Sequence, residues 1–160
     1  MSYAIVYQSR TGNTAQLAQA IREALAAEPC SYFGPPSPQA LAADTLYVGF
    51  WTDKGTCDED LAHFLQRLTH QRVFLFGTAG FGGAPEYFAQ ILARVRENLP
   101  ATVQVMGTYM CQGKMPPAVR ARYEAMEDSP RRTRMLDNFD QALTHPDQED
   151  LARLKALVTP

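Results

Sequence analysis

The chain alternates short apolar runs with segments of helical periodicity, and this alternation limits its fold more than any other feature. Continuous apolar runs occupy residues 3–7, 45–50, 73–76 and 102–109. Segments with apolar residues every three or four positions follow the first three runs, at 17–25, 60–68 and 87–99. Strands buried on both faces and separated by helices indicate a parallel sheet between two helical layers.

Right-handed crossovers then predict a three-layer α/β fold with an open, doubly wound sheet. Cys30–Phe33 adds a short edge strand, and three further helices are expected over 118–127, over 131–143 and with Pro146 near the first position of the last one. The last of these should bury Leu151, Leu154 and Leu157. We expect a single domain over 1–160, with a core at 1–110 and a loop with extra helices at 111–160.

Composition excludes several classes of protein. A net charge of −2 and a pI near 5.9 argue against nucleic-acid binding. No apolar run approaches the roughly 20 residues of a membrane helix, and we expect neither membrane insertion nor a secretory signal. Three widely spaced cysteines without a CxxC pair favour reduced thiols and a cytoplasmic location. The histidines show no metal-ligand spacing with these cysteines.

The most specific motif joins the first strand to the first helix. It consists of Ser9, Arg10, Thr11, Gly12, Asn13 and Thr14. Such a loop presents backbone N–H groups and hydroxyls to an anion at the positive end of the helix dipole. Gly12 permits a sharp turn, and Asn13 or Thr14 should cap the helix. The loop lacks the P-loop lysine, which favours a monophosphate ester over a nucleoside triphosphate. A capped polar turn without ligand is the alternative.

The motif resembles the Ser/Thr-x-Thr-Gly-x-Thr signature of the flavodoxins at every fixed position. The resemblance implies that this loop holds the phosphate of flavin mononucleotide (FMN). It also implies the strand order 2-1-3-4-5, with the flavin at the switch point beyond the carboxyl ends of the strands.

Two further loops are expected to hold the flavin ring. After the strand 45–50 come Trp51, Thr52, Asp53, Lys54 and Gly55. In flavodoxins this loop often supplies a stacking tryptophan and a glycine peptide near flavin N5, which implies these roles for Trp51 and Gly55. The alternative is that Trp51 packs on the neighbouring helix.

The other loop is rich in glycine and comprises Thr78, Ala79, Gly80, Phe81, Gly82 and Gly83, with Tyr87 just beyond. Its small residues suit close approach of the backbone to a ring. In flavodoxins the residue before the Glu-Tyr-Phe triplet is commonly the outer stacking tyrosine, and here it is Pro85. The outer aromatic is therefore absent, or Phe81 or Tyr87 replaces it.

The segment Cys111-Gln112-Gly113-Lys114 and the Pro-Pro helix after it resemble a bacterial flavodoxin-like subfamily. Some members of that subfamily accompany redox enzymes such as bilirubin-reducing flavoenzymes, so the resemblance implies a partner of this kind. Lys114 beside Cys111 could favour a thiolate, whereas a buried, inert cysteine is the alternative.

Charged residues near the expected opening of the flavin site indicate how a redox partner could dock. The acidic residues that gather there are Asp53, Asp58, Glu59, Asp60 and Glu86. A local acidic rim can guide a redox partner although the net charge is small. The basic run Arg131–Arg134 lies in the extra C-terminal part, where a solvated helix face explains it.

Three functions remain open at this stage. The first is an FMN-binding electron carrier that shuttles single electrons, through the flavin semiquinone, between a reductase and a partner redox enzyme. The second is an NAD(P)H-dependent FMN or quinone reductase, for which an open flavin face at Pro85 would leave room. The third is a flavin-free module that binds a partner, since a fold alone does not establish function.

Overall fold

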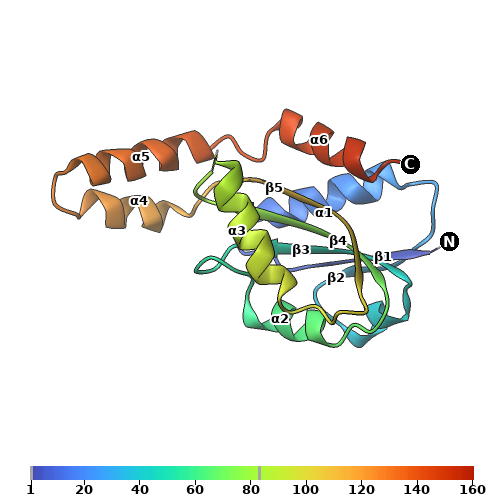
Figure 1. Cartoon of the computed structure of the whole chain (residues 1–160). Helices are drawn as coiled ribbons and strands as arrows, with labels where there is room; N and C mark the ends of the chain where they lie inside the picture. The colour runs from blue at the N-terminus through green and yellow to red at the C-terminus, as the bar shows by residue number, and fades with distance from the viewer. Residues whose placement is uncertain (1, 83) are drawn as a thin grey trace.

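A five-stranded parallel sheet lies between two layers of helices in the computed structural model, which describes residues 2–82 and 84–160 (Figure 1). The strands are β1 (Tyr3–Tyr7), β2 (Cys30–Gly34), β3 (Thr45–Trp51), β4 (Arg72–Ala79) and β5 (Gln104–Gln112). They are hydrogen-bonded in the order β2-β1-β3-β4-β5, and every pair is parallel. The expected doubly wound α/β sheet and its strand order are therefore confirmed.

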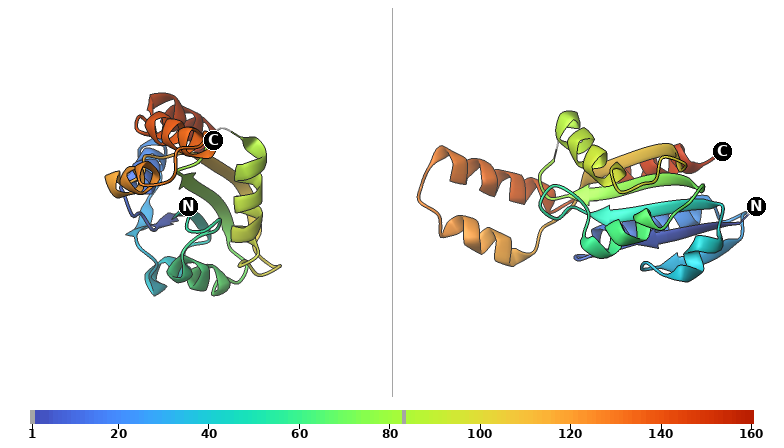
Figure 2. Two further views of the ribbon diagram at one scale, coloured as in Figure 1. Left: turned by 90° about the vertical axis from the view of Figure 1, so that its left-hand side faces the viewer. Right: turned by 60° about the horizontal axis from the view of Figure 1, so that its bottom comes forward.

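Helices cover both faces of this sheet (Figure 2). The helices of the chain are α1 (Asn13–Ala24), the 3₁₀ helix η1 (Pro38–Ala42), α2 (Glu59–Gln66), α3 (Pro85–Arg96), α4 (Pro117–Glu124), α5 (Pro130–Ala142) and α6 (Gln148–Val158). Buried residues of α1 and α6 pack against one face of the sheet, and those of α2 and α3 pack against the other. The three expected C-terminal helices are present.

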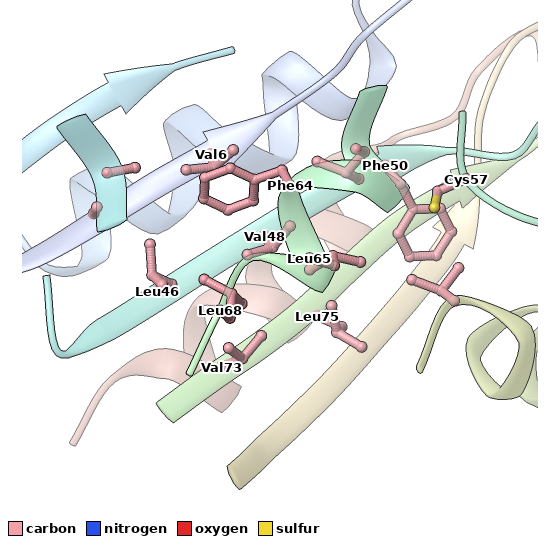
Figure 3. Packing of buried hydrophobic residues seen from close by; sticks show 14 of the residues in the cluster. Val6, Leu46, Val48, Phe50, Cys57, Phe64, Leu65, Leu68, Val73 and Leu75 are labelled. Carbon is pink, nitrogen blue, oxygen red and sulfur yellow. The ribbon is translucent and has the colours of Figure 1, made fainter. Parts of the chain in front are cut away.

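Alternate residues of each strand supply the two halves of the core. Val6, Val48 and Leu75 lie in the half of the core that faces α2 and α3, together with Phe64 and Leu65 of α2 (Figure 3). Their neighbours along the strands face α1 and α6. Because side chains alternate across a strand, a run that is apolar throughout serves both halves.

The two central strands interlock through reciprocal phenylalanine–glycine pairs. Gly49 pairs with Phe76, and Phe50 pairs with Gly77. A β-carbon at Gly49 would lie 2.3 Å from the Phe76 ring, and one at Gly77 would lie 2.3 Å from the Phe50 ring. Each ring thus occupies space that only a glycine leaves open, on opposite faces of the sheet. These pairs fix the register of the strands whose ends form the site.

Several boundaries differ from the expectations. Strands β4 and β5 continue to Ala79 and Gln112, so that Thr78 and Ala79 belong to a strand rather than a loop. The expectation that Asn13 or Thr14 caps α1 is wrong, because Gly12 is the N-cap residue and makes no side-chain cap bond.

The last helix begins later and buries a different face than expected. Asp147 is its N-cap, in a reciprocal capping box with Asp150, because a carboxylate accepts the free N–H groups of the first turn. Leu154 is buried as expected and Leu151 is half-buried. Leu157 is instead 56% exposed, and Val158 is buried in its place.

Helices α4 and α5 form an antiparallel hairpin that extends past the carboxyl ends of the strands (Figures 1 and 2). The Arg120 side chain of α4 donates two hydrogen bonds to the Asp140 carboxylate of α5, at 3.1 and 3.3 Å. Ser129 begins α5 by accepting a hydrogen bond from the N–H of Arg132. Two consecutive prolines, Pro116 and Pro117, direct the chain from β5 into α4, since proline favours a first helical position.

Candidate functional site

A cavity of about 370 Å³ lies where the loops after the strands meet the C-terminal hairpin, which is a volume typical of small-molecule sites. Residues expected from the sequence that line it are Arg10, Thr11, Asn13, Trp51, Thr52, Lys54, Gly55, Thr78, Ala79, Gly80, Phe81 and Tyr87. Ser9, Gly12, Thr14, Asp53 and Gly82 lie beside it without lining it. Gly83 lies outside the described residues. The cavity joins loops that are far apart in the sequence, as the switch-point rule requires.

The loop before α1 is built to receive an anion. Gly12 has φ 89°, which a residue with a side chain rarely adopts, and it turns the chain into the helix. The Ser9 hydroxyl accepts hydrogen bonds from the N–H groups of Gly12 and Ala15, at 3.1 and 3.3 Å. Within the described residues, no acceptor pairs with the N–H of Arg10, Thr11, Asn13 or Thr14. These groups are free to donate to a phosphate at the helix N-terminus.

Asn13 has a buried acceptor in the wall of the cavity. Its side chain is 6% exposed, and its Nδ2 donates a 2.8 Å hydrogen bond to the Lys114 carbonyl. Its Oδ1 has no donor among the described residues. An unpaired buried acceptor costs about 1–3 kcal/mol, so a ligand hydroxyl or N–H at this point would bind favourably. The ribityl hydroxyls of FMN are donors of this type, and the residues present therefore fit the group.

A network of threonines joins the start of α1 to the ends of β3 and β4. The Thr14 hydroxyl donates to the Phe50 carbonyl at 3.1 Å and lies 3.1 Å from the Thr78 hydroxyl. The Thr52 hydroxyl donates to the Thr78 carbonyl at 2.8 Å. Thr14 is fully buried, so its hydroxyl holds the loop to the sheet. The relative positions of the loops around the cavity are thereby fixed.

Trp51, the single tryptophan, ends β3 and lines the cavity. Its indole N–H donates to Asp58, the N-cap of α2, at 3.2 Å. The Arg10 guanidinium lies 5.3 Å from the centre of the indole ring, within cation–π range. The indole is thus hydrogen-bonded to α2 and also borders the cavity, and its stacking on the flavin ring stays a prediction.

The next loop makes a tight turn. Asp53 and Thr56 exchange backbone hydrogen bonds of 2.7 and 3.2 Å around Lys54 and Gly55, whose φ values are 52° and 87°. Two successive positive φ values are those of a type I′ turn, which favours glycine. Arg94 of α3 donates to the Gly55 carbonyl at 3.2 Å, which ties this turn to the helix after the glycine-rich loop.

The sequence did not reveal that the segment leading into the hairpin and its first helix line one side of the cavity. The additional lining residues are Gly113, Lys114, Met115, Pro116, Val119, Arg122 and Tyr123. Their segment was expected to form a loop and a short helix, but nothing in the residue pattern placed that helix over the strand ends. The apolar spacing of Val119, Tyr123 and Met126 was the available signal for a helix face that packs on something.

Cys111 is a buried thiol of the core. It is 4% exposed and lies among the core residues of α1 and α6. Burial, reinforced by the nearby Asp150 and Asp147 carboxylates, raises the pKa of the Cys111 thiol far above its usual range. The thiolate interpretation is wrong, because the Asp147 and Asp150 charges and the apolar surroundings outweigh any effect of Lys114.

A histidine and two carboxylates gather before α6. Ligand atoms of His145, Asp147 and Asp150 lie within 4.8 Å of one another. His145 Nδ1 lies 2.6 Å from the Asp150 carboxylate, which also accepts the N–H of Asp147 at 2.9 Å. The Tyr109 hydroxyl donates to the Asp150 carbonyl at 2.8 Å. These contacts attach the start of α6 to β5.

In the part of the chain that the structure describes, no helix is long and apolar enough to span a membrane.

Comparison with known proteins shows the family to which the chain belongs. The model of the flavodoxin domain matches residues 4–159. A flavodoxin-like domain-containing protein BilS of Clostridium symbiosum is 42% identical over 95% of this chain and 91% of its own length. A BilS protein of Clostridioides difficile is 26% identical, over 94% and 90%. A solved flavodoxin of Streptococcus pneumoniae shares the fold, with 15% identity, a TM-score of 0.62 and coverage of 99% and 95%.

The chain therefore belongs to the flavodoxin family. Membership in this family supports FMN as the cofactor, in agreement with the free N–H groups and the unpaired acceptor described above. The curated relatives of Clostridium symbiosum and Clostridioides difficile are flavodoxin-like proteins of similar length.

Proposed function

We propose that this protein is an FMN-binding electron carrier that passes electrons between a reductase and a partner redox enzyme. The observation that supports the proposal is the loop before α1: four of its N–H groups have no acceptor among the described residues, and its residues Arg10, Thr11 and Asn13 line a cavity bordered by Trp51. FMN supplies the redox chemistry there, while the chain holds the ring and sets the charges around it.

Exposed acidic groups near the site support docking to another protein. Glu59 and Asp60 lie in the first turn of α2, and Glu86 lies in the first turn of α3. Both helices follow the carboxyl ends of strands, which is the side of the sheet where the cavity lies, and all three carboxylates are exposed. They provide an anionic rim for a partner with a basic patch, although the whole chain carries only −2. The resemblance of the Cys111–Lys114 segment makes a bilirubin-reducing flavoenzyme the partner class to test first.

The experiment combines binding with electron flow. Trp51 fluorescence should be quenched on titration with FMN, since it is the single tryptophan and borders the cavity. The FMN-loaded protein should then consume NADH or NADPH only when a separate flavodoxin reductase is added. Consumption by the protein alone would indicate a reductase instead. A chain that binds no FMN at micromolar concentration would contradict both functions and leave a flavin-free binding module.

A further inference from the structure

Helix α4 and the segment that leads into it form one side of the cavity. Val119, Arg122 and Tyr123 of α4 line it, together with Met115 and Pro116 just before the helix. Positions 119, 122 and 123 are three and four residues apart, so they lie on one face of α4. Val119 and Met115 are half-buried and Tyr123 is buried, so this face is largely apolar.

A hydrogen-bonded clamp fastens the hairpin to the glycine-rich loop. The Asn138 side chain of α5 donates to the Gly80 carbonyl at 3.0 Å. Gln112 Nε2, at the end of β5, lies 3.1 Å from both the Gly80 carbonyl and Asn138 Oδ1. A β-carbon at Gly80 would lie 2.5 Å from Met115 Sδ, so the loop also packs closely on the start of the hairpin. The two walls therefore hold each other in place.

The charges of the lining point to an anionic ligand that reaches the hairpin side. Four cationic residues line the cavity: Arg10, Lys54, Lys114 and Arg122. Among the described lining residues there is no carboxylate. Two of the four cations, Lys114 and Arg122, come from the hairpin and the segment leading to it. The hairpin therefore contributes both apolar surface and positive charge to the same wall.

We propose that the α4–α5 hairpin is a ligand-contacting wall of the FMN site, with the apolar face of α4 against the flavin ring. The inference rests on the proposed function, since it takes FMN to occupy the cavity. Val119 and Tyr123 then cover the ring surface that Pro85 leaves without an outer aromatic side chain. Asn138 is a positioning residue, because it acts on the ligand through the Gly80 loop and not by contact.

The test compares FMN with riboflavin, which has the same ring and lacks the phosphate. Val119→Asp places a charge against the ring and should weaken the binding of both ligands about tenfold or more. Ala118→Asp is the matched control, since Ala118 is the exposed neighbour on α4 and does not line the cavity. It should leave both dissociation constants within about twofold of the unsubstituted protein. Circular dichroism and melting curves check that both variants are folded.

The clamp is tested by Asn138→Ala against Gln141→Ala, an exposed position on the same helix. At saturating FMN, Asn138→Ala should change the visible circular dichroism of the bound flavin, and Gln141→Ala should not. The inference is overturned if Val119→Asp and Asn138→Ala behave like the unsubstituted protein, or if Ala118→Asp is as harmful as Val119→Asp. Failure of the unsubstituted protein to bind FMN would overturn the proposed function itself, and the hairpin inference with it.

Discussion

The Asn13 side chain donates a 2.8 Å hydrogen bond to the Lys114 carbonyl across 101 positions of sequence. This bond joins the phosphate loop to the segment that leads into the C-terminal hairpin. It also fixes the amide of a residue that lines the cavity and whose buried Oδ1 has no donor among the described residues. One residue thus connects the loop at the start of α1 to the C-terminal part of the chain.

Asn13→Ala should weaken FMN binding about tenfold, because it removes an acceptor for the ligand and releases Lys114 from the loop. Fluorescence titration of FMN measures the dissociation constant. Asn98→Ala, two residues beyond the end of α3 and outside the cavity lining, is the control and should bind FMN as the unsubstituted chain does. Equal affinities of the Asn13 and Asn98 variants would show that Asn13 has no role at the site.

Gly113→Ala should disturb the hydrogen bond between the Asn13 side chain and the Lys114 carbonyl. A β-carbon at Gly113 would lie 2.5 Å from Asn13 Nδ2, so the Asn13 amide would have to leave its position against Lys114. We expect FMN affinity to fall about three- to tenfold while the melting temperature changes by only a few degrees. Unchanged affinity, with the fold intact, would contradict the proposed orientation of Asn13.

Gly77→Ala tests the interlocked strands. Its new β-carbon would lie 2.3 Å from the ring of Phe50, which is fully buried and has no room to move. The free energy of unfolding should fall by about 1–3 kcal/mol in urea titrations. Gly34→Ala is the control, because its β-carbon would meet only the hydroxyl end of half-buried Tyr32, at 3.1 Å. A Gly77 variant no less stable than the Gly34 variant would contradict this account of the register.

The cysteines should differ sharply in reactivity. Burial raises the pKa of the Cys57 and Cys111 thiols, whereas Cys30 is half-buried. At pH 8 a thiol reagent should therefore label Cys30 first in the native protein and all three cysteines after denaturation. Because the raised pKa values stabilise the neutral thiols in the folded state, unfolding free energy should decline as pH rises above about 8.5. Rapid native labelling of Cys111 would contradict its burial.

Arg122→Glu should lower the potential at which the bound flavin takes its second electron. A cation near the reduced, anionic flavin stabilises it, and reversing that charge removes this effect. We expect a decrease of about 30–60 mV in a redox titration, where 59 mV is a tenfold change for one electron. Arg131→Glu is the matched control, since Arg131 is exposed on α5 and does not line the cavity. Equal shifts in the two variants would indicate only a general effect of net charge.

Much of this architecture was predictable because local patterns determine it. Apolar runs gave the strands, and the motif at Ser9–Thr14 located the turn into α1. The position of the hairpin was not predictable, because it depends on contacts such as Asn138 with Gly80, which are 58 residues apart. The cap of α1 was mistaken for a similar reason: Thr14 has the chemistry of a cap, but its hydroxyl bonds the Phe50 carbonyl instead.

The central claim, that this chain is an FMN-dependent carrier of single electrons, is tested most directly by stepwise anaerobic reduction of the FMN-loaded protein. The absorbance spectrum is recorded after each addition of reductant. The account predicts bound flavin bands that pass through the blue or red spectrum of a one-electron-reduced flavin before full reduction. Direct passage to the fully reduced spectrum would contradict one-electron transfer, and a chain that remains colourless after mixing with FMN would contradict the cofactor itself.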